Sequence, residues 1–172
     1  MNLIRKSLNV SEHILGALSV AAFAVMVVLA AAAVFFRFVV NSSLAFPEEV
    51  VRYLFVWSVF LGAAVGLRHN MHAAVEMFVD WLPRQVKRAV LALANLLCVV
   101  FFIILIVYGA RIVMLVYPQQ SPALEISMSY VYAAVPVGAL FMLLYSLEAM
   151  LPDAGARLLS ASDDALPNQA DG

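Results

Sequence analysis

A ladder of charged and imidazole side chains between residues 68 and 80 contains possible metal ligands. Its members recur every four residues: Arg68, His72, Glu76 and Asp80. A histidine and a carboxylate four residues apart share one face of a helix, which suits a metal site. The positions opposite the ladder, however, are apolar and include Phe78, as in a helix that lies along a membrane interface with its charges in solvent. The pattern favours a solvated interfacial ladder, and we expect no metal here.

A second group of charges stands at the start of the apolar run from Val50 to Leu67. Glu48 and Glu49 precede the run, and carboxylates in the first turn of a helix are stabilised by the helix dipole. Arg52 follows Glu48 by four residues, which is the spacing of an ion pair on one helix face. We therefore predict a cluster of Glu48, Glu49 and Arg52 at a membrane surface.

The composition identifies an integral membrane protein. Of the 172 residues, 65% are hydrophobic and 12% are charged, whereas soluble proteins average about half apolar and about a quarter charged. The net charge of −1 gives no reason to expect a nucleic-acid partner. The single cysteine, Cys98, cannot form an internal disulfide, which excludes thiol oxidoreductases with paired cysteines. With neither a nucleotide-binding loop nor a nucleophile constellation, the sequence predicts no enzyme, no catalytic residue and no cofactor.

Four apolar runs are long enough to cross a bilayer, so the expected fold is an all-α integral membrane protein with four transmembrane helices and interfacial amphipathic segments. The predicted transmembrane helices cover residues 14–40, 47–67, 84–117 and 127–150. The predicted remaining parts are an N-terminal segment, an interfacial helix and a disordered tail, at residues 1–13, 68–82 and 151–172. A frayed tail is the open alternative for the N-terminal segment.

Arginine and lysine are unevenly distributed between the two sides of the predicted spans. The side with both termini and the 68–88 loop holds seven of them: Arg5, Lys6, Arg68, Arg84, Lys87, Arg88 and Arg157. The opposite loops, residues 41–49 and 118–126, hold none. Because basic residues concentrate on the cytoplasmic side, we expect both termini in the cytoplasm. The predicted charged cluster then lies near the membrane surface opposite the cytoplasm, which is the periplasmic surface if the chain is from a bacterial inner membrane.

Small residues and one proline indicate how the helices pack. Gly62 and Gly66 are four residues apart, and Ala134 and Gly138 repeat this spacing in the fourth span. Small residues at this spacing let helix backbones approach closely, either within the chain or against another protein. Pro136 lies inside the fourth apolar run and should kink it.

Two alternatives assign the chain an activity of its own. A self-contained four-helix transporter usually needs a carboxylate near mid-membrane, but here every acidic residue lies at or beyond the end of a predicted span. A membrane anchor of a redox complex would bind haem through histidines deep in facing helices, whereas His13, His69 and His72 stand at helix ends. The residues favour an accessory subunit that packs against a larger membrane partner.

The combination resembles the small membrane (DctQ-like) subunit of tripartite ATP-independent periplasmic (TRAP) transporters, over about residues 14–150. The matching residues are Glu48-Glu49, Arg52-Tyr53, Trp57, Phe60-Leu61-Gly62-Ala63-Ala64, Arg68, His72, Pro83, Ser121-Pro122-Ala123-Leu124-Glu125-Ile126, Tyr132, Pro136 and Gly138. Ser127 departs from the pattern, because the family often has proline there.

The resemblance implies a subunit of the bacterial inner membrane that works with a large membrane subunit and a periplasmic solute-binding protein. Such systems import organic acids with an ion gradient, usually of sodium, and the small subunit would act as a rigid brace in the lipid bilayer. The residues expected to form subunit-interface or structural contacts are Arg37, Glu48, Glu49, Arg52, Tyr53, Trp57, Gly62, Gly66, Pro136 and Gly138.

Overall fold

The computed structural model describes residues 2–40, 45–70 and 84–149. Its helices are α1 (Asn2–Phe38), α2 (Ala45–Asn70), α4 (Arg84–Leu115), α5 (Ser129–Tyr132) and α6 (Ala134–Ala149). Within these residues, four helical stretches are long and apolar enough to cross a membrane: Lys6–Phe38, Phe46–His69, Ala89–Leu115 and Ser129–Glu148. The predicted all-α fold with four transmembrane helices is confirmed.

The bounds of the first and fourth helices differ from those expected. Residues 2–13 continue the first span without a break, instead of forming a segment separate from it. The fourth span begins at Ser129, two residues later than expected. Just before it, the hydroxyl of Ser127 donates a hydrogen bond to the carbonyl of Tyr117 and also contacts the hydroxyl of Ser129. Most of the predicted interfacial helix and the whole predicted tail lie outside the described residues.

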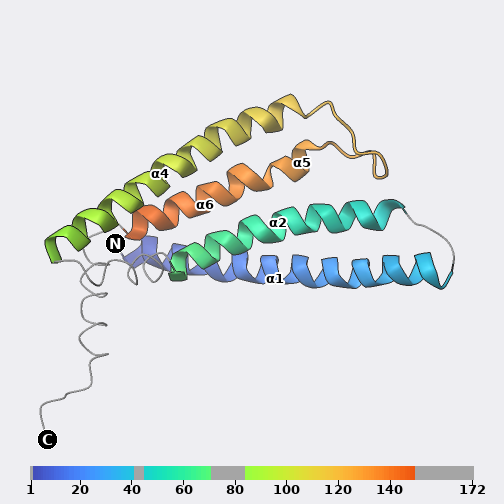
Figure 1. Ribbon diagram of the computed structural model, residues 1–172, viewed down its shortest axis with the longest axis horizontal. Helices are drawn as coiled ribbons and strands as arrows, with labels where there is room; N and C mark the ends of the chain where they lie inside the picture. Colours follow the sequence, from blue (N-terminus) through green and yellow to red (C-terminus); the bar gives the residue numbers. More distant parts are fainter. Residues whose placement is uncertain (1, 41–44, 71–83, 150–172) are drawn as a thin grey trace, which may run out of the picture.

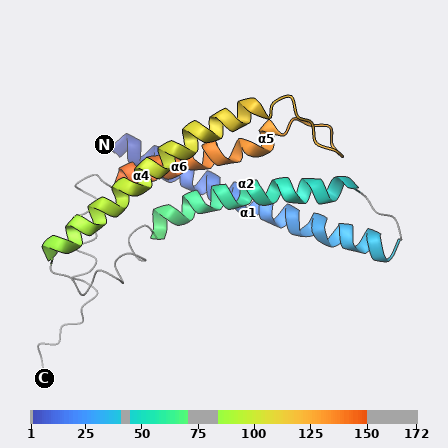
Figure 2. The same ribbon diagram turned by 45° about the horizontal axis from the view of Figure 1, so that its top comes forward.

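The helices form a single row rather than a closed bundle (Figures 1 and 2). Along the row α1 packs on α2, α2 on α6, and α6 on α4, so that α1 and α4 lie at its two edges. We call the end where α1 begins and α6 ends the terminal end. The opposite end, where α1 leads towards α2 and α4 towards α5, is the hairpin end (Figure 1).

Each neighbouring pair in the row has a glycine at its contact. Between α1 and α2, a Cβ atom added at Gly62 would lie 2.9 Å from the Ser19 hydroxyl oxygen. That hydroxyl donates a hydrogen bond to the carbonyl of Ser58 at 2.8 Å. Gly66, by contrast, would meet no heavy atom of the described chain within 4 Å. The small-residue pattern of α2 therefore serves contact with α1 at Gly62.

The other two contacts are equally close. A Cβ atom at Gly138 of α6 would lie 2.8 Å from the Cβ of Phe60 on α2 and 3.1 Å from its carbonyl oxygen. One at Gly109 of α4 would lie 3.1 Å from the Cδ of Pro136 on α6. In a bilayer such close packing replaces the hydrophobic effect as the main attraction between helices. The three contacts thus hold the order α1, α2, α6, α4.

The fourth span is interrupted at the position where its proline predicts a kink. α5 ends at Tyr132 and α6 begins at Ala134, with Ala133 between them. Because Pro136 has no N–H group, it cannot donate to the carbonyl of Tyr132, and its ring crowds that carbonyl. The same ring then packs against Gly109 of α4. The proline both breaks the span and fills the contact with its neighbour.

We expect Gly138→Ala to destabilise the purified chain in detergent, because the new methyl group would lie 2.8 Å from the Cβ of Phe60 and 3.1 Å from its carbonyl oxygen. Overpacking of this kind costs about 1–3 kcal/mol. The measurement is the apparent melting temperature, with Gly66→Ala as the matched control. The control has open space and should gain up to about 1 kcal/mol from the higher helix propensity of alanine. Equal melting temperatures for the two variants would contradict the close α2–α6 contact.

Candidate functional site: polar clusters at the two ends of the row

Arg68 joins three helices at the terminal end. Its guanidinium lies in the last turn of α2 and donates two hydrogen bonds to the carboxylate of Glu148 on α6, each of 3.0 Å. It also donates to Glu12 on α1, to the carbonyl of Leu8 at 3.0 Å and to the side-chain oxygen of Asn9 at 2.6 Å. All five N–H donors of the guanidinium are therefore used.

The surroundings of this guanidinium complete a cluster. Arg68, Glu12 and Glu148 have only 15–17% of their side chains exposed. The ring of Tyr145 lies under the guanidinium at 5.1 Å, and the tyrosine hydroxyl is 3.1 Å from the hydroxyl of Ser11. We call Arg68, Glu12, Glu148 and Tyr145 the arginine cluster. Charges withdrawn from water in this way require opposite charges and hydrogen bonds, and the cluster supplies both.

Glu49 occupies a comparable position at the hairpin end. Only 7% of this residue is exposed, and its carboxylate accepts hydrogen bonds from the Tyr53 hydroxyl at 2.5 Å and from the backbone N–H groups of Ala123 and Leu124 at 3.0 and 2.9 Å. Backbone donors to a carboxylate form strong, charge-assisted bonds. Glu49 on α2 therefore fixes the loop that connects α4 to α5.

That loop has a defined shape. The backbones of Gln120 and Ser127 pair in antiparallel fashion, and the N–H of Ser121 donates to the carbonyl of Ile126 at 2.9 Å. Glu125 adopts a φ of 54°, in the left-handed region that non-glycine residues seldom occupy. A strained turn of this kind persists only where its surroundings hold it. The hydrogen bonds that Ala123 and Leu124 donate to Glu49 help to hold this one.

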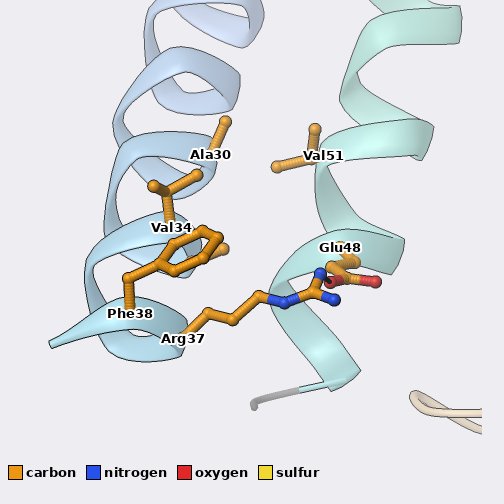
Figure 3. A pocket seen from close by; sticks show the side chains of 7 residues that line it. Ala30, Val34, Arg37, Phe38, Glu48 and Val51 are labelled. Atoms are coloured by element: carbon orange, nitrogen blue, oxygen red, sulfur yellow. Dashed lines mark ion pairs between the residues drawn. The ribbon is translucent and has the colours of Figure 1, made fainter. Parts of the chain in front are cut away.

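Arg37 and Glu48 form a separate pair at the hairpin end, across the α1–α2 contact (Figure 3). Their nitrogen and oxygen atoms are 3.7 Å apart, and both side chains are largely exposed. Among the described residues, Glu48 makes its ion pair with Arg37 and not with Arg52, the partner that the four-residue spacing predicts. The pair borders a groove of about 270 Å³ whose lining is otherwise apolar: Ala30, Ala33, Val34, Phe38 and Val51.

The remaining candidate residues are dispersed. Trp57 donates its indole N–H to the carbonyl of Tyr130 at 3.1 Å and so ties α2 to α5, while Arg52 is exposed. Three members of the expected interfacial ladder lie outside the described residues: His72, Glu76 and Asp80. Over the described part of the chain, no group of three or more histidine, cysteine or acidic side chains is arranged to hold a metal ion.

From its spacing, Arg68 was expected in the interfacial ladder, and its partners on α1 and α6 were not predicted. Glu12 and Glu148 were not singled out, because they lie on two different helices and far from Arg68 in the sequence. One signal was available. In a chain of four alternating spans, the start of the first helix and the ends of the second and fourth meet at one side. Two acidic residues and an arginine at these positions are expected to pair.

Comparison with known proteins identifies the family of this chain. The family model of the DctQ component of tripartite ATP-independent periplasmic transporters matches residues 26–155. The chain belongs to this family. A putative TRAP transporter small permease protein of Haemophilus influenzae is 33% identical, over 79% of this chain and 82% of that protein. This small permease is thus a multi-pass protein of the bacterial inner membrane.

Two further relatives carry more specific names. The C4-dicarboxylate TRAP transporter small permease protein DctQ of Rhodobacter capsulatus is 31% identical to this chain. The match covers 58% of this chain and 45% of the Rhodobacter protein. The sialic acid TRAP transporter permease protein SiaT of Haemophilus influenzae is 26% identical over 82% of this chain. The matched region is only 22% of SiaT, so this small permease corresponds to about a fifth of that longer protein.

For the hairpin end, we expect Glu49→Ala to release the backbone amides of Ala123 and Leu124. Loss of a hydrogen bond to a charged acceptor should speed their hydrogen exchange by about tenfold or more. The measurement is amide exchange of the full chain in detergent, read by mass spectrometry of peptides that cover the loop. Glu48→Ala, at the exposed neighbouring carboxylate, serves as control and should leave the loop protected. Unchanged exchange in Glu49→Ala would contradict the role of Glu49.

For the terminal end, we expect Arg68→Gln to destabilise the small permease, because Glu148 loses its cation and Glu12 keeps, within the described part of the chain, only its contact with His69. Breaking a fully buried pair costs about 3–5 kcal/mol, which sets an upper limit for these slightly exposed groups. Arg68→Lys keeps the charge without the five donors and should give an intermediate melting temperature in detergent. Arg52→Gln removes an exposed arginine of the same helix and is the control. Equal melting temperatures for Arg68→Gln and Arg52→Gln would refute the prediction.

Proposed function

We propose that this small permease braces a large membrane subunit during the import of an organic acid, which a periplasmic solute-binding protein delivers. An ion gradient, with sodium as the coupling ion, drives the import. The subunit has no catalytic activity, and both termini face the cytoplasm. The hairpin end then lies on the periplasmic side, where its loops are available to the solute-binding protein.

The observation that carries this proposal is the single row of helices. A transporter that works alone must enclose a path for its solute between helices. Over most of their length the described helices lie in one row, in the order α1, α2, α6, α4, and at the terminal end the start of α1 also reaches α6 through Ser11 and Tyr145 (Figure 1). A thin layer of helices with one small buried cluster is suited to supporting another protein.

Burial within the chain supports the same function. No residue in the most apolar 18-residue stretch of α1 is buried, and only 11% of that stretch of α4 is buried. The corresponding share for the fourth span, in the middle of the row, is 33%. The two edge helices therefore present wide apolar surfaces to the membrane and to any partner within it, as a subunit of a larger complex would.

The positions of the acidic side chains argue against a self-contained transporter. Among the described helices, Glu12 and Glu148 belong to the arginine cluster at the terminal end, and Glu48 and Glu49 lie at the hairpin end. Transporters coupled to protons or cations place ionisable groups near the middle of the membrane. Binding of solute and ion accordingly belongs to the partner.

The named relatives support the partner and the class of solute. SiaT contains a region similar to this chain within a longer permease protein, which favours physical association of the two parts. The named solutes of the relatives, sialic acid and C4-dicarboxylate, are both organic acids. We extend this solute class to the complex that contains the present chain.

The test is a pull-down of the tagged full chain from native membranes in mild detergent, with the co-purifying proteins identified by mass spectrometry. We expect a much larger membrane protein in equal amount. Vesicles that contain both proteins should accumulate the organic acid when the binding protein and an ion gradient are supplied, and vesicles with this chain alone should not. Recovery of the tagged chain from native membranes without a membrane partner, or uptake by vesicles that contain the chain alone, would overturn the proposal.

A further inference from the structure

The groove beside Arg37 and Glu48 at the hairpin end is separate from the arginine cluster and from the bonds of Glu49. It runs between the last two turns of α1 and the first turns of α2, with Ala30 and Val34 on one side and Val51 on the other (Figure 3). The side chain of Arg37 extends from α1 towards Glu48 across its mouth (Figure 3). Its volume of about 270 Å³ falls below the roughly 300–1,000 Å³ of pockets that enclose a whole small molecule. It suits one part of a longer ligand.

The polarity of the groove changes along the membrane normal. The first and second spans have their hairpin-end limits at Phe38 and Phe46, so Arg37 and Glu48 lie at the membrane boundary. Ala30 is eight residues before Phe38, which places it about 12 Å further into the membrane at 1.5 Å per residue. The groove thus passes from a charged mouth to an apolar floor. A phospholipid has the same order of headgroup and acyl chain.

The two charges at the mouth retain free bonding capacity. Their separation of 3.7 Å exceeds the roughly 2.7–3.2 Å of an N–H···O hydrogen bond, so the pair is a contact of charges. The side chains of Arg37 and Glu48 are 64% and 55% exposed. A guanidinium binds phosphate through paired N–H groups, and a carboxylate accepts hydrogen bonds from an ammonium group. Together they complement a headgroup that contains one phosphate and one ammonium.

We propose that this groove binds one molecule of phosphatidylethanolamine, with its phosphate on Arg37, its ammonium on Glu48 and the start of one acyl chain between Ala30, Ala33 and Val51. A purely anionic lipid would meet the carboxylate of Glu48 and be disfavoured. The bound lipid fills the space between the ends of α1 and α2 and links them at the membrane boundary. This site requires only the membrane location of the chain and is independent of the bracing function.

The experiment is native mass spectrometry of the full chain in detergent, titrated separately with dioleoyl phosphatidylethanolamine and dioleoyl phosphatidylglycerol. We expect the wild type to retain one phosphatidylethanolamine in preference to phosphatidylglycerol. Arg37→Gln removes a charge-assisted bond and should weaken phosphatidylethanolamine binding by about tenfold. Glu48→Gln should abolish the preference between the two lipids. Ala33→Leu fills the groove and should weaken the binding of both.

Two matched controls separate this site from general lipid contact. Arg111→Gln removes another exposed arginine, and Ala31→Leu adds the same bulk at an exposed position of α1 outside the groove. Both should bind as the wild type does. Equal binding of the two lipids by the wild type, or equal effects of Arg37→Gln and Arg111→Gln, would overturn the proposal. So would an Ala33→Leu chain that keeps the lipid but loses a co-purifying membrane protein, because the groove would then hold a protein partner.

Discussion

The hydrogen bonds of one guanidinium, that of Arg68, fix two helices against a third. Arg68 uses all five of its N–H donors on acceptors from α1 and α6, which fixes the position of both helices along the axis of α2. An arginine near the end of a membrane span is tolerated when it is paired. Arg68 therefore requires its partners on α1 and α6, and these bonds select one arrangement of the three helices. With these axial positions fixed, Ser19 lies against Gly62 and Phe60 lies against Gly138, where the helix backbones approach closely.

The hairpin end is held by a different chemistry. There a carboxylate, that of Glu49, binds backbone N–H groups of the loop rather than another side-chain charge. The edge helix α4 is held in addition by a side-chain pair in its span, in which the hydroxyl of Ser146 donates to Asn95 at 2.5 Å. The row is therefore fastened at both membrane boundaries, although it has no large apolar core. A thin layer gains its rigidity from such directional bonds, since apolar contact alone distinguishes poorly between helices and lipid.

The sequence predicted the features that depend on composition and on local geometry. Length and hydropathy are sufficient for the four spans, and the missing N–H group of Pro136 is sufficient for the break before α6. The contacts between helices were harder. Spacing within α2 favoured Glu48 with Arg52, but the end of α1 brings Arg37 to Glu48 instead. The partners of Arg68 required knowledge of which helix ends meet, and a pattern within one helix does not contain that information.

The fastening at both boundaries bears on how a transport cycle is divided between subunits. Alternating access requires some helices to change their mutual positions. In this row such a change would separate Arg68 from Glu12 and Glu148 and leave charges without partners in a membrane environment, at a cost of several kcal/mol. At the other boundary it would expose the carboxylate of Glu49 and release its loop. This resistance to sliding fits the proposed function, in which the chain remains fixed while a partner moves against it.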